Sequence, residues 1–275
     1  MKIAVIIPHK NAGERLERCL LSLIRQPKLE GADFEFLAID DNDPEDYGPD
    51  HKLVNNIRDF DNRVVPLLNQ EEPGVSGARN TGIIWALRRK ADYITFLDAD
   101  DQWTEDGARN IVEAIKENEP AQIIELNHKR HYTETGLTRI KHLQPSGTYT
   151  IANRPPYWAC VWNKIIAAPL IERAGLRFPE GLQYGEDEAF MIDALAAHNE
   201  ITTDGKHIAL IRWFDNKQSL SRVKTRADLL NHTTALIDAL GKHATNPEIA
   251  KNICMIIGEH WQSPTFMEKF GGGIL

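Results

Sequence analysis

Cysteine is scarce in this chain of 275 residues: Cys19, Cys160 and Cys254 are its only three, and they lie far apart. No pair has the Cys-x-x-Cys spacing of a structural zinc site, and the odd number leaves one outside any disulfide pairing. Long apolar runs are missing as well. The first ends at Pro8, and no later one approaches the ~18 residues of a membrane span. We therefore expect a soluble, cytoplasmic protein without a membrane span or a disulfide framework.

An excess of positive charge is also absent. The chain has 32 Lys and Arg against 40 Asp and Glu, a net charge of −8 at pH 7. This balance argues against a molecule that condenses as a whole on nucleic acid or on an anionic membrane. With 42% hydrophobic and 26% charged residues, the composition is that of an ordinary globular protein.

Short apolar runs alternate with helical patterns over the first half of the chain. The runs at 3–7, 34–39, 64–68, 93–97 and 122–127 predict buried strands. Helices between them are expected to begin at the N-caps Asn11, Ser76 and Thr104. This alternation predicts an α/β fold with a mostly parallel sheet and helices on both faces.

The second half of the chain has a different pattern. A polar stretch reaches about Gly147, Pro169 and Gly175 frame a short helix, and a longer helix is predicted over 186–198. Two further helices are expected from Ala227 onward. We interpret residues 1–223 as one catalytic domain and residues 224–275 as a small helical appendage.

Carboxylates follow two of the predicted strands. Asp40 and Asp41 end one, and Asp98-Ala99-Asp100 ends another. Because the carboxyl ends of parallel strands meet at one edge of the sheet, these groups would repel each other unless a cation or hydrogen-bond donors lay between them. An Asp-x-Asp pair offers the hard oxygen ligands that Mg²⁺ or Mn²⁺ prefers. The alternative is a turn and cap segment, but the preceding strand and the second acidic pair favour the metal site.

Several motifs occur together in one order along the chain. They are AVIIPHKN, LAIDDNDPED, PGVSGARNTGI, FLDADD, VWNKII and RFPEGLQYGEDEAF. With these motifs the sequence resembles glycosyltransferase family 2, which has the GT-A fold, from residue 3 to about residue 222. The resemblance implies a half that binds a nucleotide sugar over 1–101 and a half that binds the acceptor over 102–223.

The resemblance also implies roles for the matched residues. Asp187 would be the catalytic base, and Asp100 with Asp98 would bind Mn²⁺ or Mg²⁺. The donor nucleotide would contact Pro8, Asn11, Asp41, Arg79, Asp98, Ser219, Ser221 and Arg222. The acceptor would contact Trp158, Trp162, Lys164 and Glu186. The family often has a histidine where this chain has Asp215, so no third metal ligand is assigned.

Ordinary structural roles stay open for several of these residues. Arg79 and Lys164 would then be solvated surface cations, and Trp158 and Trp162 would be core residues. The acids around Asp187 would simply stabilise the first turn of a helix.

The activity that the resemblance implies is an inverting, metal-dependent transfer of one hexose or pentose from a nucleotide sugar to an acceptor hydroxyl. The nucleotide sugar is expected to be a UDP-sugar. Processive synthases of the family carry membrane spans and a QxxRW signature, which this chain lacks. Two alternatives remain, a nucleotidyltransferase of the same architecture and a non-catalytic nucleotide-sugar binding module. Homo-oligomers through the C-terminal helices are a further expectation.

One segment departs from the acidic character of the chain. The segment between His128 and His142 contains four basic residues and one acidic residue, which gives it a net charge of +3. The basic residues are Lys129, Arg130, Arg139 and Lys141. A solvated hairpin is one interpretation. The other is a hairpin beside the acceptor cleft that favours a phosphate-bearing acceptor, such as a polyol-phosphate polymer, a lipid-linked phosphate or hydroxymethylated phage DNA. A glycan is a further candidate acceptor.

Overall fold

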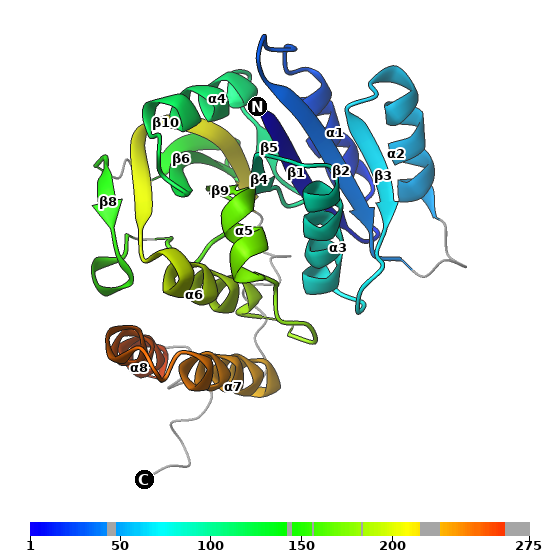
Figure 1. Cartoon of the computed structure of the whole chain (residues 1–275). Coiled ribbons are helices and arrows are strands. Elements are labelled where there is room, and N and C mark those ends of the chain that lie inside the picture. Colours follow the sequence, from blue (N-terminus) through cyan, green and yellow to red (C-terminus); the bar gives the residue numbers. More distant parts are fainter. Residues whose placement is uncertain (43–47, 142–144, 156, 183, 215–225, 262–275) are drawn as a thin grey trace.

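One ten-stranded sheet organises the computed structural model, which describes residues 1–42, 48–141, 145–155, 157–182, 184–214 and 226–261 (Figure 1). The strand order is β3-β2-β1-β4-β9-β6-β10-β5, with β7 beside β6 and β8 beside β10. The strands are β1 (Lys2–His9), β2 (Asp33–Asp40), β3 (Val64–Leu68), β4 (Tyr93–Phe96), β5 (Gln102–Trp103), β6 (Ile123–Tyr132), β7 (Leu137–Lys141), β8 (Gly147–Tyr149), β9 (Lys164–Ala167) and β10 (Ile201–Phe214).

The sheet is parallel in its first half and mixed in its second. Strands β3, β2, β1 and β4 are parallel to one another, as their crossover helices require. Strand β9 runs antiparallel to both β4 and β6, and β6 is parallel to β10. The prediction of a mostly parallel α/β sheet is confirmed, and the antiparallel pairs lie in the half where the sequence pattern changes.

Helices cover both faces of this sheet, as predicted. They are α1 (Glu14–Ile24), α2 (Pro49–Phe60), α3 (Val75–Arg88), α4 (Gly107–Glu117), α5 (Ala168–Ala174), α6 (Glu186–His198), α7 (Arg226–Lys242) and α8 (Pro247–Trp261), with a short 3₁₀ helix η2 (Ile151–Asn153). One hydrophobic core takes its helical side chains from α1, α2 and α4, and the other takes them from α3, α5, α6, α7 and α8. The sheet is therefore buried on both sides.

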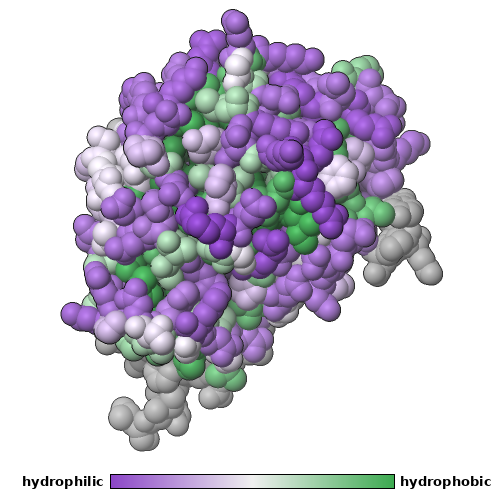
Figure 2. All heavy atoms as spheres, in the orientation of Figure 1, coloured by the Kyte–Doolittle hydropathy of each residue, from purple (hydrophilic) through white to green (hydrophobic). Residues whose placement is uncertain are grey.

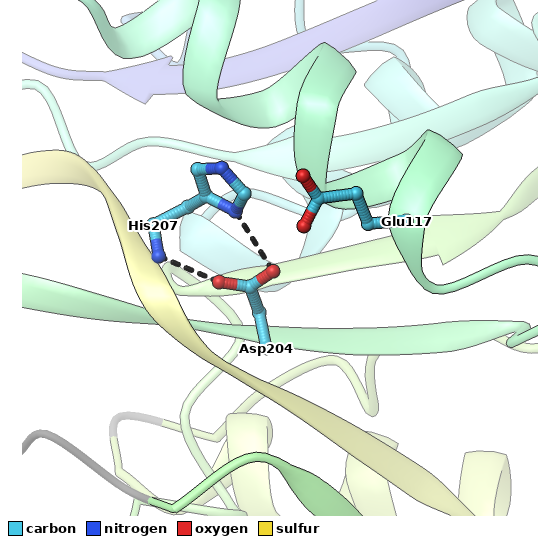
Figure 3. A group of neighbouring side chains, drawn as sticks. All are labelled: Glu117, Asp204 and His207. Carbon is cyan, nitrogen blue, oxygen red and sulfur yellow. Dashed lines mark hydrogen bonds and ion pairs between the residues drawn. The ribbon is translucent and has the colours of Figure 1, made fainter.

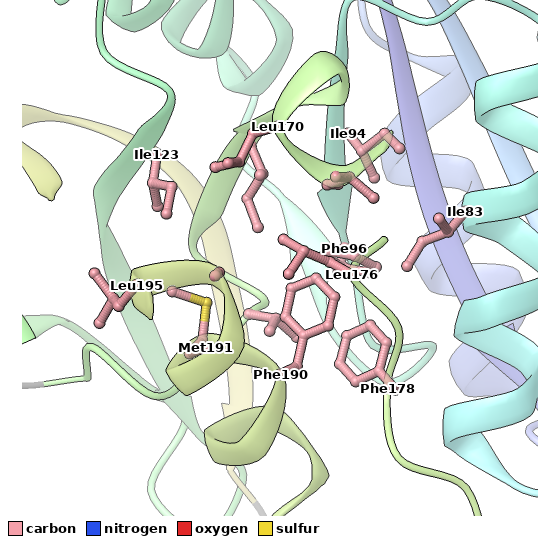
Figure 4. Close-up of a cluster of buried hydrophobic side chains, with 14 of the residues drawn as sticks. Ile83, Ile94, Phe96, Ile123, Leu170, Leu176, Phe178, Phe190, Met191 and Leu195 are labelled. Atoms are coloured by element: carbon pink, nitrogen blue, oxygen red, sulfur yellow. The ribbon is translucent and has the colours of Figure 1, made fainter. Parts of the chain in front are cut away.

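An aromatic cluster fixes α6 against the sheet (Figure 4). The rings of Phe178 and Phe190 are stacked with centroids 4.2 Å apart, and Phe96 of β4 meets Phe178 edge-on at 5.3 Å. All three side chains are almost fully buried. Edge-on and stacked pairs of this kind are favourable beyond the area they bury. The cluster therefore holds the start of α6 close to the end of β4.

Three predicted N-caps are wrong by a few residues. Helix α1 starts after Gly13, because Asp50 of α2 accepts the backbone N–H groups of Ala12 (2.6 Å) and Gly13 (2.9 Å), while Asn11 lies in the preceding turn. Ser76 lies inside α3. The hydroxyl of Thr104 donates to a β10 carbonyl instead of capping α4. For α1 and α4, tertiary partners therefore set the helix start.

The two C-terminal helices form a further layer. In Figure 1, α7 and α8 lie beyond α6, and the buried Leu236 and Ile253 join the core on that side. Both helices are confirmed, whereas the domain boundary at 223 stays a prediction. Over the described residues, no helix combines the length and apolar character needed to cross a bilayer. The face in Figure 2 is mostly hydrophilic, with hydrophobic residues in separate patches.

Candidate active site

Asp41 lies at the carboxyl edge of the sheet, where α3 begins. Its carboxylate accepts the backbone N–H of Gly74 at 2.9 and 3.0 Å and the side-chain amide of Asn69 at 2.7 Å. Lys10 is 3.5 Å away. The positive end of a helix dipole also favours a carboxylate at this place. Asp41 is thus held in one orientation at the end of β2.

Arg79 joins the two acidic motifs of the sequence. It lies on α3 and is 4% exposed, and its Nη2 is 3.1 Å from Asp98. Its Nη1 donates to Glu186 at 3.0 Å and to Asp187 at 2.8 Å. Burial alone lowers the pKa of Arg79, but the three carboxylates raise it above its ordinary value. The interpretation of Arg79 as a solvated surface cation is therefore wrong.

Asp187 stands in the first turn of α6, among partners from distant parts of the chain. Its second oxygen lies 3.4 Å from the backbone N–H of Val161. Burial raises the pKa of Asp187 to about 7, against the opposing effect of Arg79, and Glu186 and Asp98 add to the rise. A carboxylate with a pKa near the working pH is well suited to accept a proton in a reaction.

Asp98, Asp100 and Asp101 form an acidic group whose ligand oxygens lie within 4.8 Å of one another. Burial raises the pKa of Asp100, and the neighbouring Asp98 raises it further, while Arg212 opposes part of this rise. Asp101 is fully buried, accepts the backbone N–H of Trp213 at 2.9 Å and lies 3.0 Å from Nε of Arg212. The two predicted ligands, Asp98 and Asp100, carry the hard oxygen atoms that a divalent cation prefers. Asp98 also contacts Arg79 and Arg212, and Asp101 contacts Arg212.

Arg212 was not among the predicted site residues. It stands on β10 between Asp101 and Asp98, with its Nη2 3.4 Å from Asp98. Its guanidinium lies over the ring of Trp162, 4.4 Å from the centroid. The available signal was the third aspartate of FLDADD, because a fully buried carboxylate needs a cationic partner.

The residues predicted for the acceptor side are mostly buried. Trp158 is 8% exposed and Trp162 is 6% exposed, which disagrees with a role as sugar-stacking platforms and agrees with the core alternative. Lys164 is fully buried, so neither direct acceptor contact nor a surface position is correct. Its ammonium lies 2.8 Å from Glu125 and donates to the carbonyls of residues 157 and 160. Lys164 therefore fixes the loop that carries Val161.

Two further predicted donor residues lie near the end of β1. Pro8 is half-buried near the end of β1, and Asn11 is exposed in the turn that follows it. Both lie close to the carboxyl edge of the sheet, as their predicted donor contact requires. Ser219, Ser221 and Arg222, and also Asp215, lie outside the described residues.

A second cluster of metal-binding residue types lies elsewhere, between α4 and β10 (Figure 3). It consists of Glu117, Asp204 and His207. Asp204 accepts hydrogen bonds from the side chains of His207 (2.8 Å) and Asn118 (3.0 Å) and from two backbone N–H groups. The other ring nitrogen of His207 faces Glu113 at 3.3 Å. These contacts tie an irregular part of β10 to α4, which explains the cluster without a metal.

Comparisons with known proteins identify the family of this chain. The sequence profile described as glycosyl transferase family 2 matches residues 4–161, more than half of the chain. The chain belongs to glycosyl transferase family 2. This membership confirms the predicted family, the GT-A fold and the prediction of a glycosyltransferase, so the nucleotidyltransferase and the non-catalytic binding module are set aside.

Relatives of this family 2 chain include two bacterial proteins. Poly(ribitol-phosphate) beta-N-acetylglucosaminyltransferase TarP of Staphylococcus aureus (strain N315) is 27% identical over 257 residues, which are 91% of this chain and 74% of TarP. The uncharacterized glycosyltransferase EpsJ of Bacillus subtilis (strain 168) is 25% identical over 84% of this chain and 66% of EpsJ. The chain thus spans about two thirds to three quarters of these two relatives.

Solved structures share the fold. S. aureus TarS, crystallised with UDP-GlcNAc, is 18% identical with a TM-score of 0.76, covering 100% of this chain and 76% of that chain. The mannosyltransferase PcManGT from Pyrobaculum calidifontis, in complex with GDP-Man and Mn²⁺, is 14% identical with a TM-score of 0.63, covering 98% of this chain and 73% of that chain.

Proposed function

We propose that this enzyme transfers one sugar from a UDP-sugar to a hydroxyl of a phosphate-bearing acceptor, with inversion at the anomeric carbon. The observation that carries the proposal is the position of Arg79. This one guanidinium contacts Asp98, the first acid of the Asp-x-Asp motif, and Asp187, the proposed base. The residues that hold the leaving diphosphate and the residue that accepts the proton of the attacking hydroxyl must lie on either side of a single sugar. The shared contact with Arg79 brings Asp98 and Asp187 that close to each other.

The donor would bind at the carboxyl edge of the sheet. Asp41, held at the start of α3, would contact the base or ribose, and Pro8 and Asn11 lie on the neighbouring strand end. Asp98 and Asp100 would hold Mn²⁺ or Mg²⁺, which when bound neutralises charge on the diphosphate. UDP-GlcNAc in the TarS crystal and Mn²⁺ in the PcManGT structure support a nucleotide sugar and a metal.

Asp187 would act on the acceptor. As the acceptor oxygen forms its bond to the anomeric carbon, the bond from that carbon to the diphosphate breaks, and the hydroxyl proton moves to Asp187. A single displacement of this kind inverts the anomeric centre, by analogy with inverting glycosidases. Arg79 and the Val161 N–H orient the carboxylate, and Glu186, bound to the same guanidinium, lies beside it for an acceptor hydroxyl.

A row of three arginines supports an anionic acceptor. The predicted hairpin is formed by β6 and β7, in which Arg130 stands directly opposite Arg139. On its other side Arg130 pairs in register with Arg212 of β10, which contacts Asp98. Side chains at paired positions point to the same face of a sheet, and like charges directly opposite each other are destabilising. Asp98 and Asp101 already neutralise Arg212, so a bound phosphate would add its negative charge beside Arg130 and Arg139, and the row begins beside the donor site.

The first experiment measures turnover. Purified protein is incubated with Mn²⁺, poly(ribitol phosphate) and each of several UDP-sugars, and released UDP is quantified with and without EDTA. We expect release with one donor, loss of it with EDTA, and an inverted anomeric configuration of the product by NMR. Absence of transfer from all UDP-sugars would refute the donor assignment, and hydroxymethylated DNA in place of the polymer tests the other acceptor class.

A second experiment tests the arginine row. Arg130→Gln/Arg139→Gln should raise the KM for the polymer about tenfold at low salt and flatten its salt dependence, because two phosphate contacts are lost. The donor KM should not change. Arg58→Gln/Arg88→Gln, two exposed arginines on α2 and α3, is the charge-matched control. Equal polymer KM values in both double variants would contradict an anionic acceptor at this hairpin.

A further inference from the structure

We infer that His232, on the C-terminal helix α7, is a positioning residue for the base Asp187. The inference rests on the proposed role of Asp187. Helix α7 lies outside residues 4–161, the part of the chain matched by the family profile. It nevertheless places a buried side chain against the segment that carries the base.

His232 contacts this segment at three points. Its side chain is 1% exposed, and its Nε2 lies 2.7 Å from the carboxylate of Glu188. Its ring meets the ring of Tyr184 edge-on, with centroids 5.0 Å apart. The third contact is with the backbone of Gly185, which precedes α6. One imidazole thus contacts residues on both sides of Asp187.

Gly185 shows how closely the imidazole approaches. The residue has φ +86°, a conformation that L side chains rarely adopt. A Cβ built on it would lie 2.1 Å from Cδ2 of His232 and 2.5 Å from Cγ. The ring therefore occupies the space that any other side chain would need, and it packs directly on the turn into α6.

The position of Asp187 depends on these contacts. Gly185 and Glu188 are two residues before it and one residue after it, so fixing both fixes the first turn of α6. That turn sets the distances from the carboxylate to Arg79, 2.8 Å, and to the Val161 N–H, 3.4 Å. Small displacements of a catalytic group reduce rate strongly. His232 thereby connects the C-terminal helices to the rate of the chemical step.

Leu236 provides a matched control. It lies on α7 one turn after His232, is fully buried and belongs to the core on that side of the sheet. Leu236→Ala removes packing from α7 without removing an imidazole from Gly185 or Glu188. If His232 only held α7 in place, His232→Ala and Leu236→Ala would lose the same fraction of kcat. The comparison is made at temperatures at which the two variants are equally stable.

The experiment compares wild type, His232→Ala, His232→Gln, Leu236→Ala and Asp187→Asn as full-length proteins. Turnover is measured with UDP-GlcNAc, Mn²⁺ and poly(ribitol phosphate), and amide hydrogen exchange is measured over residues 184–188. We expect His232→Ala to lower kcat about tenfold with little change in donor KM, and to speed exchange over 184–188. His232→Gln, whose amide can still donate to Glu188, should recover most of both losses, and Leu236→Ala should show neither.

Two results would overturn the inference: equal kcat losses in His232→Ala and Leu236→Ala, or unchanged exchange over 184–188 in His232→Ala. Failure of the proposed function gives a different result. If Asp187→Asn keeps wild-type turnover, Asp187 is not the base. If wild type shows no turnover, the donor and acceptor assignment fails, and hydrogen exchange, which needs no substrate, still decides whether His232 fixes the segment.

Discussion

Replacing Asp187 with asparagine should change how the stability of the protein depends on pH. Burial raises the pKa of this carboxyl from 3.8 to about 7 in the folded protein. Between these values the folded state holds a proton that the unfolded chain releases, so the free energy of unfolding falls as pH rises. Above pH 7 the whole loss of stability that the raised pKa causes is present. Asparagine does not titrate, so Asp187→Asn should lack this loss.

The expected magnitude follows from the pKa shift. From about pH 5 to pH 7 the folded protein binds roughly one extra proton, which gives a ceiling of about 3 kcal/mol at ~1.4 kcal/mol per pH unit. The side chain is 22% exposed, so solvent screens part of this effect. We expect the stability difference, Asp187→Asn minus wild type, to grow by about 1–2 kcal/mol between about pH 5 and about pH 8. The constant effect of the amide on hydrogen bonding cancels in that comparison.

Urea unfolding followed by tryptophan fluorescence at the two pH values measures this difference. Asp238→Asn, an exposed carboxyl on α7, is the control and should run parallel to wild type. In parallel, wild-type kcat should rise with pH through about 7 and then level off, because the proposed base, Asp187, would act in its ionised form. A stability difference for Asp187→Asn that is the same at both pH values would refute the reasoning.

Three further substitutions test the contacts that support the site. Arg79→Ala removes the cation shared by three carboxylates. It should lower kcat/KM about 100-fold or more, measured by UDP release, and destabilise the fold by roughly 3–5 kcal/mol, measured by urea unfolding. Near-normal turnover would contradict the role of Arg79. Lys164→Met leaves Glu125 buried without its 2.8 Å partner and should cost about 3–5 kcal/mol, whereas adding Glu125→Met should restore part of that loss. Gly82→Ala would place a Cβ 2.6 Å from a β1 side chain and should cost roughly 1–3 kcal/mol, while Gly241→Ala, with open space around it, should not lower stability.

Local sequence determined the elements and the chemistry that they carry. The helix over 186–198 was predicted with the bounds that the structure has, because three acidic residues in the first turn of an apolar-patterned segment are a local signal. The Asp-x-Asp pair after β4 was likewise apparent, since a buried apolar strand ending in acids places them at the sheet edge. Patterns of this kind depend on neighbours within a few residues, and the sequence displays those neighbours directly.

Tertiary structure decided which of these groups meet. Arg79 contacts Asp187, 108 positions later in the chain, and Arg212 neutralises Asp101 from the end of a strand that the pattern did not predict. Lys164 was expected to contact the acceptor or, alternatively, to lie at the surface, and it is fully buried. His232 contacts the segment of the proposed base from a helix interpreted as an appendage. Ion pairs and ring contacts act over a few ångströms in space and leave no periodicity along the chain, so their partners become visible only when the sheet brings distant segments together.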